Sequence, residues 1–574
     1  MRFLKISLLF FSISVFSQNN FTTPFERGNG NQSTTYEECI AFYEKLDESF
    51  ANIQMIQIGT TDSGKPLHLV LFSSEGKFDF DEYFTKNKAV ILINNGIHAG
   101  EPDGIDATMM LMRDLAMGKI KTAKNTLIAA IPVYSVGGML NRNSHSRANQ
   151  NGPEEYGFRG NARNYDLNRD FIKSDTKNSR SFQKLFTELN PDIFIDNHVS
   201  NGADYQYTFT CIATQHERLG HYLGKYFKEE FYPEIVKDMN KKKIDVVPYV
   251  NVHSTTPDNG FEQFTDTPRY ATGYTSLFNT IGFVPETHML KDYKERVKVT
   301  YEFMVSVITY SNMNWKKIKE YRALNEIGFK MGSAYPLNWE IDSTKVSYID
   351  FKGYQGGYKP SDISGKDRLF YDKSKPFTKK IPFYGDFKRT KSIIIPYAYI
   401  VPQSQWEILE LLKLNNINAH RLEKDTVIEV ESYKIESYQT SKSPYEGHYV
   451  HYDTKTTKSY EKILFLKGDY VFSTDQRGVK YLVETLEPEA VDSYFNWNFF
   501  DPILQQKEYF SSYVFEDLAK EFLDKNPKIK AELEQKKQND KAFAENGAAQ
   551  LDWVYRQSPY YEKAHLQYPV YRVN

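Results

Sequence analysis

The chain has 574 residues, of which 40% are hydrophobic, so it is long enough for two or more domains and too apolar for general disorder. Its 72 basic and 74 acidic residues give a formal net charge of −2. The basic residues form no stripe, so nucleic-acid binding has no support. Two cysteines, Cys39 and Cys211, are too few for a zinc site built mainly from thiolates, and they could form one bridge or remain two buried thiols.

The N-terminus has the pattern of a secretory signal peptide. A short basic start, Met1–Lys5, precedes the apolar run Ile6–Phe16, and Val15 and Ser17 occupy the positions that a signal peptidase reads. The apolar run is about half of the roughly 20 residues that a membrane span needs, and no Cys follows it to carry a lipid anchor. We therefore predict a signal peptide at residues 1–17 and an exported protein, periplasmic or extracellular, without a stable membrane anchor after cleavage.

Strands and helices alternate through the first half of the chain. Helical spacing from Tyr36 to Phe50 is followed by two strands within residues 52–73, and a long helical pattern from Asp292 to about Glu326 closes the region. Between these lie predicted helices at Pro102–Leu115, Asn178–Leu189 and His216–Phe231, and predicted strands at Ala89–Ile93, Leu127–Tyr134, Ile193–Asp196, Tyr205–Ala213, Val246–Val252 and Phe283–Pro285. This alternation is typical of an α/β fold with a mixed, mostly buried sheet sandwiched by helices.

The pattern changes beyond residue 328. Short aromatic-rich strands are predicted to about residue 480, interrupted by one helix at Gln405–Leu414, and Asn526–Lys541 has the composition of a solvated helix. We therefore predict a catalytic domain at residues 18–328 and a mixed, strand-rich C-terminal α+β region at residues 329–574. The C-terminal region contains no segment that predicts a functional site.

A candidate metal motif follows the strand Ala89–Ile93. The stretch NNGIHAGEPDGID, residues 94–106, places His98 and Glu101 three positions apart. An H-x-x-E motif alone is a weak signal, because residues 420–423 match it as well, without supporting residues nearby, and are interpreted as surface. The first match lies between a buried strand and a helix start, so both side chains can point at one ion.

A catalytic zinc site usually takes three protein ligands, often two His and one Glu, and leaves a fourth position open. The third ligand must therefore come from another strand end. In PDIFIDNH, residues 191–198, an apolar strand runs directly into His198. Taken alone, His198 would be interpreted as a core or surface histidine, but beside the first motif it becomes the best third ligand.

Two further segments contain groups that suit a hydrolytic site. Residues 158–170, FRGNARNYDLNRD, combine three Arg with several amides, and a guanidinium fork binds a carboxylate in bidentate fashion. The alternative is an exposed loop with ion pairs. In IGFVPETH, residues 281–288, Glu286 ends an apolar run, where desolvation would raise its pKa towards that of a general base. The alternative for Glu286 is a structural carboxylate.

The order of these motifs (H-x-x-E, then D-x-N-R, then a strand-end His and a strand-end Glu) resembles the carboxypeptidase A-like zinc metallopeptidase family. The segments TYEE (residues 35–38) and IGTTDSGKPL (residues 58–67) also look like that family's first helix and strand, so the resemblance covers about residues 33 to 310. It implies one zinc ion held by His98, Glu101 and His198. It also implies that Asp166, which is not itself a ligand, orients the imidazole of His98.

The same resemblance implies how a peptide would be held and cut. Asn168 and Arg169 would bind the free C-terminal carboxylate of a peptide substrate, and Glu286 would be the general base for a zinc-activated water. Either Arg159 or Arg163 would stabilise the oxyanion.

The family's substrate-capping tyrosine has no clear match, and Tyr270 and Tyr274 are the two candidates for substrate contact. The residue that would sense the terminal side chain of the substrate is not assigned.

The sequence therefore predicts an exported zinc metallocarboxypeptidase. One alternative keeps the metal and changes the substrate: a deacylase of N-acyl amino acids, or an amidase or endopeptidase of cell-wall peptides, in which Arg169 would still recognise a carboxylate. Another alternative is an inactive peptide-binding protein, whose signature would be a lost ligand or base. Neither loss is found in this sequence.

Overall fold

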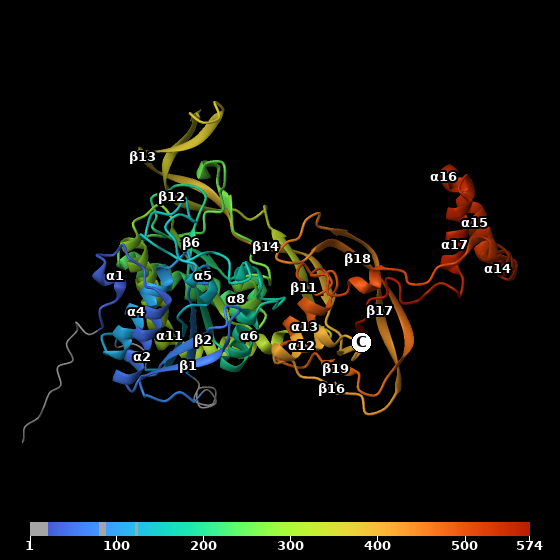
Figure 1. Ribbon diagram of the computed structural model, residues 1–574, viewed down its shortest axis with the longest axis horizontal. Helices are drawn as coiled ribbons and strands as arrows, with labels where there is room; N and C mark the ends of the chain where they lie inside the picture. The colour runs from blue at the N-terminus through green and yellow to red at the C-terminus, as the bar shows by residue number, and fades with distance from the viewer. Residues whose placement is uncertain (1–20, 80–87, 121–123) are drawn as a thin grey trace, which may run out of the picture. The chain divides into compact units, whose positions relative to one another are not determined.

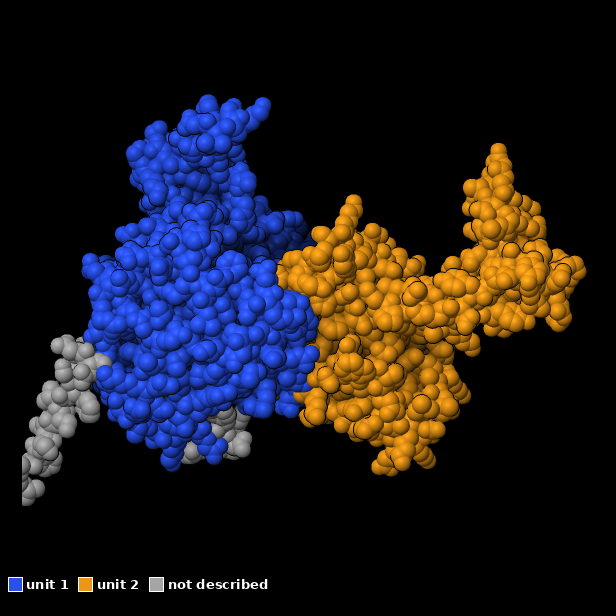
Figure 2. All heavy atoms as spheres, in the orientation of Figure 1, with its two compact units in different colours: residues 1–329, 339–391, 414–416 blue, residues 330–338, 392–413, 417–574 orange. Residues whose placement is uncertain are grey.

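The computed structural model describes residues 21–79, 88–120 and 124–574 (Figure 1). The predicted signal peptide lies outside the described residues. None of the helices described is both long enough and apolar enough to cross a membrane. The chain divides into two compact units (Figure 2): unit 1 contains Met1–Phe329, Trp339–Lys391 and Leu414–Asn416, and unit 2 contains Lys330–Asn338, Ser392–Lys413 and Ile417–Asn574.

A mixed sheet forms the centre of unit 1. Its strands are β1 (Ile53–Thr60), β2 (Pro66–Phe72), β3 (Ala89–Asn94), β4 (Thr126–Ile131), β5 (Ile193–Asp196), β6 (His198–Ser200), β7 (Phe209–Ala213), β8 (Val246–Pro248) and β10 (Ile281–His288). Among the described residues the order is β1-β2-β4-β3-β5-β10-β7-β8, and β6 pairs with β10. The central strands β4, β3, β5 and β10 are parallel, whereas β1, β2 and β7 bring antiparallel pairings. The carboxyl ends of β3 and β5 therefore lie side by side.

Helices cover both faces of this sheet, which confirms the predicted α/β class. Ile193 and Ile195 point to one face and join a core with the helices α2 (Tyr36–Ser49), α4 (Asp103–Ala116), α8 (His221–Tyr226), α9 (Tyr232–Lys241) and α11 (Tyr293–Gly328). Phe194 points to the other face, where it contacts Phe182 and Phe186 of α6 (Lys177–Leu189). The alternation of side chains along β5 thus buries both faces.

The predicted helix at His216–Phe231 is broken in the structure. It consists of α7 (His216–Leu219), α8 and the π-helical turn η3 (Phe227–Phe231). Gly220 separates α7 from α8 with φ +95°, a conformation that ends the helix and that residues other than glycine rarely adopt. The remaining short elements of unit 1 are α1 (Pro24–Arg27), α5 (Val136–Leu140), η2 (Leu167–Arg169), η4 (Pro257–Asn259) and α10 (Ala271–Ser276).

A long hairpin from the later part of the chain also belongs to unit 1 (Figure 1). Its strands β12 (Ser347–Pro360) and β13 (Asp367–Tyr384) are far longer than the short strands expected there, and β13 continues into parallel pairing with β9 (Phe261–Glu262). Phe351 and Ile381 of the hairpin share a buried cluster with Tyr205, Tyr207 and Phe261. This shared core explains why the first unit extends past residue 328, where the sequence analysis placed its end.

Unit 2 is built around a second sheet. Its strands, in the order β16-β19-β15-β20-β17-β18 among the described residues, are β16 (His420–Arg421), β19 (Tyr470–Ser473), β15 (Ala398–Val401), β20 (Tyr571–Val573), β17 (Thr426–Thr440) and β18 (His451–Phe465). Its helical elements are α12 (Trp406–Leu414), α13 (Val479–Leu486), η5 (Asp501–Leu504), α14 (Ser512–Lys525), α15 (Pro527–Asn539), α16 (Lys541–Ala544) and α17 (Gly547–Gln557). The chain passes between the units along β11 (Ala334–Ile341) and β14 (Phe387–Ile394). His420 and Glu423, the second H-x-x-E match, are exposed, as predicted.

Candidate metal centre and active site

Side-chain amides that follow β3 form hydrogen bonds between the strand ends that carry the proposed ligands. Asn94 donates its Nδ2 to Asp196 Oδ1 at 2.9 Å, and Asn95 Oδ1 accepts from Asn197 Nδ2 at 2.8 Å. Both bonds cross between the ends of β3 and β5, where Asn94 and Asp196 are paired in register. These buried amides fix the distance between the segment that carries His98 and the segment that carries His198.

Glu101 is placed by a tight turn and a closely packed helix start. Its backbone N–H donates to His98 O at 2.9 Å, which brings the two side chains onto the same side of the turn, and α4 begins two residues later. At Gly104, in the first turn of α4, a Cβ would lie 2.4 Å from Asn197 Cβ. Only glycine therefore lets the helix start approach the strand ends this closely.

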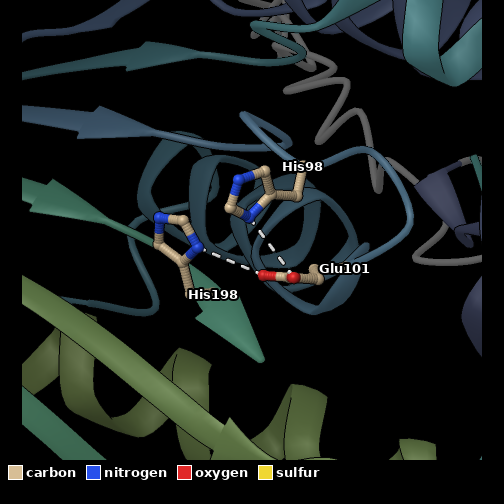
Figure 3. A group of neighbouring side chains, drawn as sticks. All are labelled: His98, Glu101 and His198. Atoms are coloured by element: carbon tan, nitrogen blue, oxygen red, sulfur yellow. Dashed lines mark hydrogen bonds and ion pairs between the residues drawn. The ribbon is translucent and has the colours of Figure 1, made fainter. Parts of the chain in front are cut away.

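The three predicted ligands converge (Figure 3). His98 Nδ1 lies 3.3 Å from Glu101 Oε1, His198 Nδ1 lies 3.1 Å from Glu101 Oε2, and one ligand atom from each residue falls within 4.8 Å of the others. All three side chains are buried. Apart from the nearby carboxylate, His98 Nδ1 has no hydrogen-bond partner among the described residues. Two imidazole nitrogens and one carboxylate turned towards a common point match the donor set of a catalytic zinc.

The outer ring nitrogens are held by carboxylates, as in many zinc sites. His98 Nε2 contacts Asp166 Oδ1 at 2.8 Å, and His198 Nε2 contacts Asp196 Oδ2 at 3.0 Å. Burial alone would raise the pKa of Asp166, but His98, Arg159 and Arg169 hold it well below its usual range. Because each Nε2 is engaged, both Nδ1 atoms are presented inwards. The residues present therefore fit a single zinc ion.

Glu286 lies beside the ligands because of strand pairing. β10 runs parallel to β6 with Glu286 in register with His198. Burial raises the pKa of Glu286 to about 8, since the opposing effect of His198 is smaller and the nearby Glu101 raises it further. Its buried Oε2 has no hydrogen-bond partner among the described residues. The result is a carboxyl group that exchanges a proton near neutral pH, as expected from its place at the end of an apolar run.

The Arg-rich segment brings two guanidinium groups to the site. Arg159 donates Nε to Asp166 Oδ2 at 3.0 Å and Nη2 to the same oxygen at 2.9 Å, while its Nη1 lies 3.5 Å from Glu101 Oε1. Arg169 donates Nη1 to the backbone oxygen of Asn168 at 2.8 Å, and its guanidinium lies 4.5 Å from the ring centre of Tyr270. Arg159 is thus tied to the metal ligands, whereas Arg169 stacks on an aromatic wall further away.

One cavity of about 270 Å³ joins these groups. Its volume is below the ~300–1,000 Å³ of sites for drug-sized ligands, so it suits a small ligand or one part of a larger one. It is lined by His98, Glu101, Arg159, Asn168, Arg169, His198, Val199, Ser200, Asn201, Ile212, Tyr249, Asn251, His253, Phe264, Asp266, Tyr270, Ala271, Val284 and Glu286.

Arg163 and Tyr274, two of the residues singled out in the sequence, do not line this cavity. Arg163 donates to Asp175 O at 3.2 Å and stacks on Tyr165, so its guanidinium is engaged outside the cavity. Tyr274 is fully buried on α10, where its hydroxyl donates to Asn415 Oδ1 at 2.7 Å. Its ring packs among Phe side chains on the far face of the sheet, so the assignment of Tyr274 to substrate contact is corrected.

Several residues of the site were not found from the sequence. Tyr249, Asn251, His253, Phe264 and Asp266 form a wall of the cavity. The strand predicted at Val246–Val252 ends at Pro248, so all five lie in the mostly irregular stretch that follows it. Arg147 reaches Glu101 Oε1 at 2.9 Å from the loop before the Arg-rich segment. The residues around Arg147 match no known catalytic or binding motif, so only the folded structure shows its contact with Glu101.

Comparisons with known proteins find similarity to carboxypeptidases. The family model described as "Zinc carboxypeptidase" matches residues 39–256, which confirms the resemblance stated above. The chain is 23% identical to Carboxypeptidase 2 of Trichophyton rubrum over 431 residues, 71% of this chain and 74% of that protein. It is 22% identical to Carboxypeptidase 2 of Trichophyton equinum over 497 residues, 82% and 85% respectively. A metallo-carboxypeptidase from Burkholderia cenocepacia aligns with a TM-score of 0.37 and 14% identity over 49% of this chain and 70% of that chain.

Proposed function

We propose that this protein is an exported zinc metallocarboxypeptidase that hydrolyses the C-terminal peptide bond of peptides. The observation that carries the proposal is one cavity lined by a zinc-type ligand set, a carboxyl group with a raised pKa and the guanidinium groups of Arg159 and Arg169. Export rests on the basic and apolar pattern of residues 1–17.

His98 and His198 would hold the zinc through Nδ1, and Glu101 would hold it through its carboxylate. A zinc ion bound there would supply Lewis-acid chemistry, polarising the scissile carbonyl and activating water. Asp166 and Asp196 keep the imidazole rings in the orientation that exposes Nδ1.

Glu286 would serve as the general base through its Oε2 atom. A carboxylate with an ordinary pKa is too weak a base to hold a proton near pH 7, but burial gives Glu286 a pKa of about 8 in the metal-free protein. A cation held by the three ligands favours the carboxylate and lowers this value. We therefore expect kcat/KM to rise with pH along an acidic limb centred below pH 8, because the base must be unprotonated to accept the proton.

The substrate's terminal carboxylate would be bound by Arg169 with Asn168. The ring of Tyr270 limits the positions open to the Arg169 fork, so less entropy is lost when a carboxylate binds. Arg159 would stabilise the oxyanion: Asp166 holds its Nε and Nη2, which leaves Nη1 directed towards the metal ligands. Arg163, which does not line the cavity, is not assigned this role.

A peptide pool tests the proposal. Each peptide is supplied with a free and with an amidated C-terminus, zinc-loaded protein is added, and the products are read by mass spectrometry. We expect loss of single residues from free C-termini only. Glu286→Gln should lower kcat by about 10²–10⁴-fold, the usual contribution of a general base.

The alternatives give different outcomes in the same assay. If the protein binds zinc stoichiometrically but cuts no peptide, the carboxypeptidase proposal fails, and N-acyl amino acids and cell-wall peptides become the substrates to assay. Equal cleavage of free and amidated peptides would remove the carboxylate-binding role of Arg169 and Asn168.

A further inference from the structure

Arg147 is a cationic residue at the metal ligands that the proposed mechanism leaves without a role. Its Nη1 lies 2.9 Å from Glu101 Oε1, closer than the 3.5 Å of Arg159 Nη1 to the same oxygen. The Arg147 side chain is 16% exposed, whereas that of Arg159 is 41% exposed and is shared with Asp166. Arg147 is therefore the stronger and better shielded partner of this carboxylate.

The chain makes room for Arg147 at the position before Glu101. Residue 100 is glycine, and a Cβ there would lie 2.8 Å from Cδ of Arg147. The same Cβ would lie 3.0 Å from Gly157 O, so that backbone oxygen would also have to shift by a few tenths of an ångström. Any side chain at position 100 would thus displace the Arg147 side chain from its path to Glu101.

A hydrogen bond to Gln150 holds the Arg147 guanidinium beside Glu101. Arg147 Nε donates to Gln150 Oε1 at 2.7 Å, and Gln150 Nε2 donates to Gly100 O at 3.0 Å and to Gly152 O at 3.1 Å. Gln150 therefore connects the arginine to the backbone of the metal motif itself. Arg147, Gln150 and Gly100 therefore form one connected set of contacts beside Glu101.

The geometry points to Arg147 as the positioning residue of Glu101, an inference that rests on the proposed zinc site. Glu101 Oε2 is fixed by Val199 N at 2.9 Å and faces His198 Nδ1, and Arg147 makes the shortest of the contacts to the other oxygen, Oε1. Arg147 fixes Glu101 Oε1 and so sets the rotation of the carboxylate about the Cγ–Cδ bond. A carboxylate held at both oxygens presents the same face to both imidazoles before any ion arrives, which preorganises the ligand set.

Zinc affinity measured by competition with a chelator tests this role without using activity. In Arg147→Met we expect zinc to bind about 10–100-fold more weakly, the usual cost of losing an outer partner of a metal ligand. Arg147→Lys should recover part of the loss, because it restores the charge but not the fork. Gly100→Ala should also weaken zinc binding although Arg147 remains present, because the added methyl displaces it.

Arg142→Met is the matched control. Arg142 lies in the same loop, its side chain is 18% exposed, and it donates to the backbone oxygens of Thr34 and Glu155 rather than to a metal ligand. Its removal should leave the zinc dissociation constant within about twofold of the wild type, whatever it does to the melting temperature. The melting temperature of each metal-free variant shows whether it is folded.

The inference is overturned if folded Arg147→Met binds zinc as tightly as the wild type, or more tightly. It is also overturned if Arg142→Met weakens zinc binding as much as Arg147→Met does, since the effect would then belong to the loop as a whole. If Arg147→Met does not fold, Arg147→Lys and Gly100→Ala decide in its place. Failure of the wild type itself to bind zinc would instead contradict the proposed function, and it is seen before any variant is compared.

Discussion

Glu286 shows, at the scale of one residue, that the proposed base conflicts with stability. Its carboxyl is buried near the carboxylate of Glu101 with Oε2 left without a hydrogen bond among the described residues. Burying a charge without a partner is unfavourable, and the protein responds by raising the pKa of the group. The property that makes Glu286 a useful base therefore destabilises the metal-free fold.

This conflict predicts a pH-dependent gain in stability for Glu286→Gln in the metal-free protein. Between its ordinary pKa of 4.5 and the folded value of about 8, the folded state keeps a proton that the unfolded state releases. The contribution of Glu286 to the free energy of unfolding therefore falls as pH rises through this window. Gln carries no such proton, so the variant should match the wild type near pH 4.5 and exceed it at pH 8.

Urea unfolding of the wild type and of Glu286→Gln at several pH values, in the presence of chelator, measures the difference between their free energies of unfolding. A difference that stays constant from pH 4.5 to pH 8 would show that Glu286 is not the group with the raised pKa.

The convergence of the three proposed ligands could be predicted from the sequence, but their neighbours could not. His98, Glu101 and His198 follow apolar strands, and residues at strand ends have few places to lie once the strands are parallel neighbours. Arg147 and Tyr249 belong to irregular loops, whose course depends on contacts with distant residues. Tyr274 was misplaced because a tyrosine on a short helix can face either the cavity or the core, and the sequence does not show which.

At the scale of elements, the start of α4 is held in place by a buried ion pair. Asp103, two residues after Glu101, accepts from Arg296 Nε of α11 at 2.9 Å, and both side chains are fully buried. Arg296 also donates to the backbone oxygens of Asn151, Gly152 and Met289. One guanidinium thus joins the metal motif, the long closing helix and the loop that carries Arg147.

We expect Arg296→Met to lower the free energy of unfolding by about 3–5 kcal/mol, because it leaves a buried carboxylate without its partner. The exposed pair Lys237–Glu234 offers a control, and Lys237→Met should cost at most about 1 kcal/mol. Denaturant unfolding of the three proteins checks the prediction. Equal losses in the two variants would contradict the importance of the buried pair.

Periodic elements were predicted within a few residues, and irregular ones were not. The helix predicted at Pro102–Leu115 spans Asp103–Ala116, because a sustained apolar stripe fixes both its type and its extent. The hairpin β12–β13 has a mostly exposed, polar pair of strands whose length no apolar pattern marks. Its attachment to the first unit depends on pairing with residues 261–262, which lie far away in the sequence.

At the scale of the whole molecule, the metal ligands all belong to unit 1, so zinc should stabilise that unit selectively. A ligand at 1,000 times its dissociation constant adds about 4.1 kcal/mol to the stability of the folded state that binds it. Hydrogen exchange read by mass spectrometry, with zinc or with chelator, should therefore slow in β3, β5 and β10. Exchange in β17 and β18 of unit 2 should not change.

Equal slowing in both units would show that they unfold as one cooperative body. Slowing in neither would show that the ligand set does not retain zinc.

The pairing of β9 with β13 also affects the order in which parts of unit 1 can fold during synthesis of the chain. Gln263 N donates to Tyr384 O at 2.9 Å, so the cavity wall around residues 249–266 gains this part of its support after residue 384 has been synthesised. At about 5–20 residues per second, the roughly one hundred residues between Glu286 and Tyr384 take about 5–20 seconds. During this interval the proposed ligands and base exist on a chain whose cavity wall lacks its pairing with β13, so the proposed activity should be complete only once the hairpin has formed.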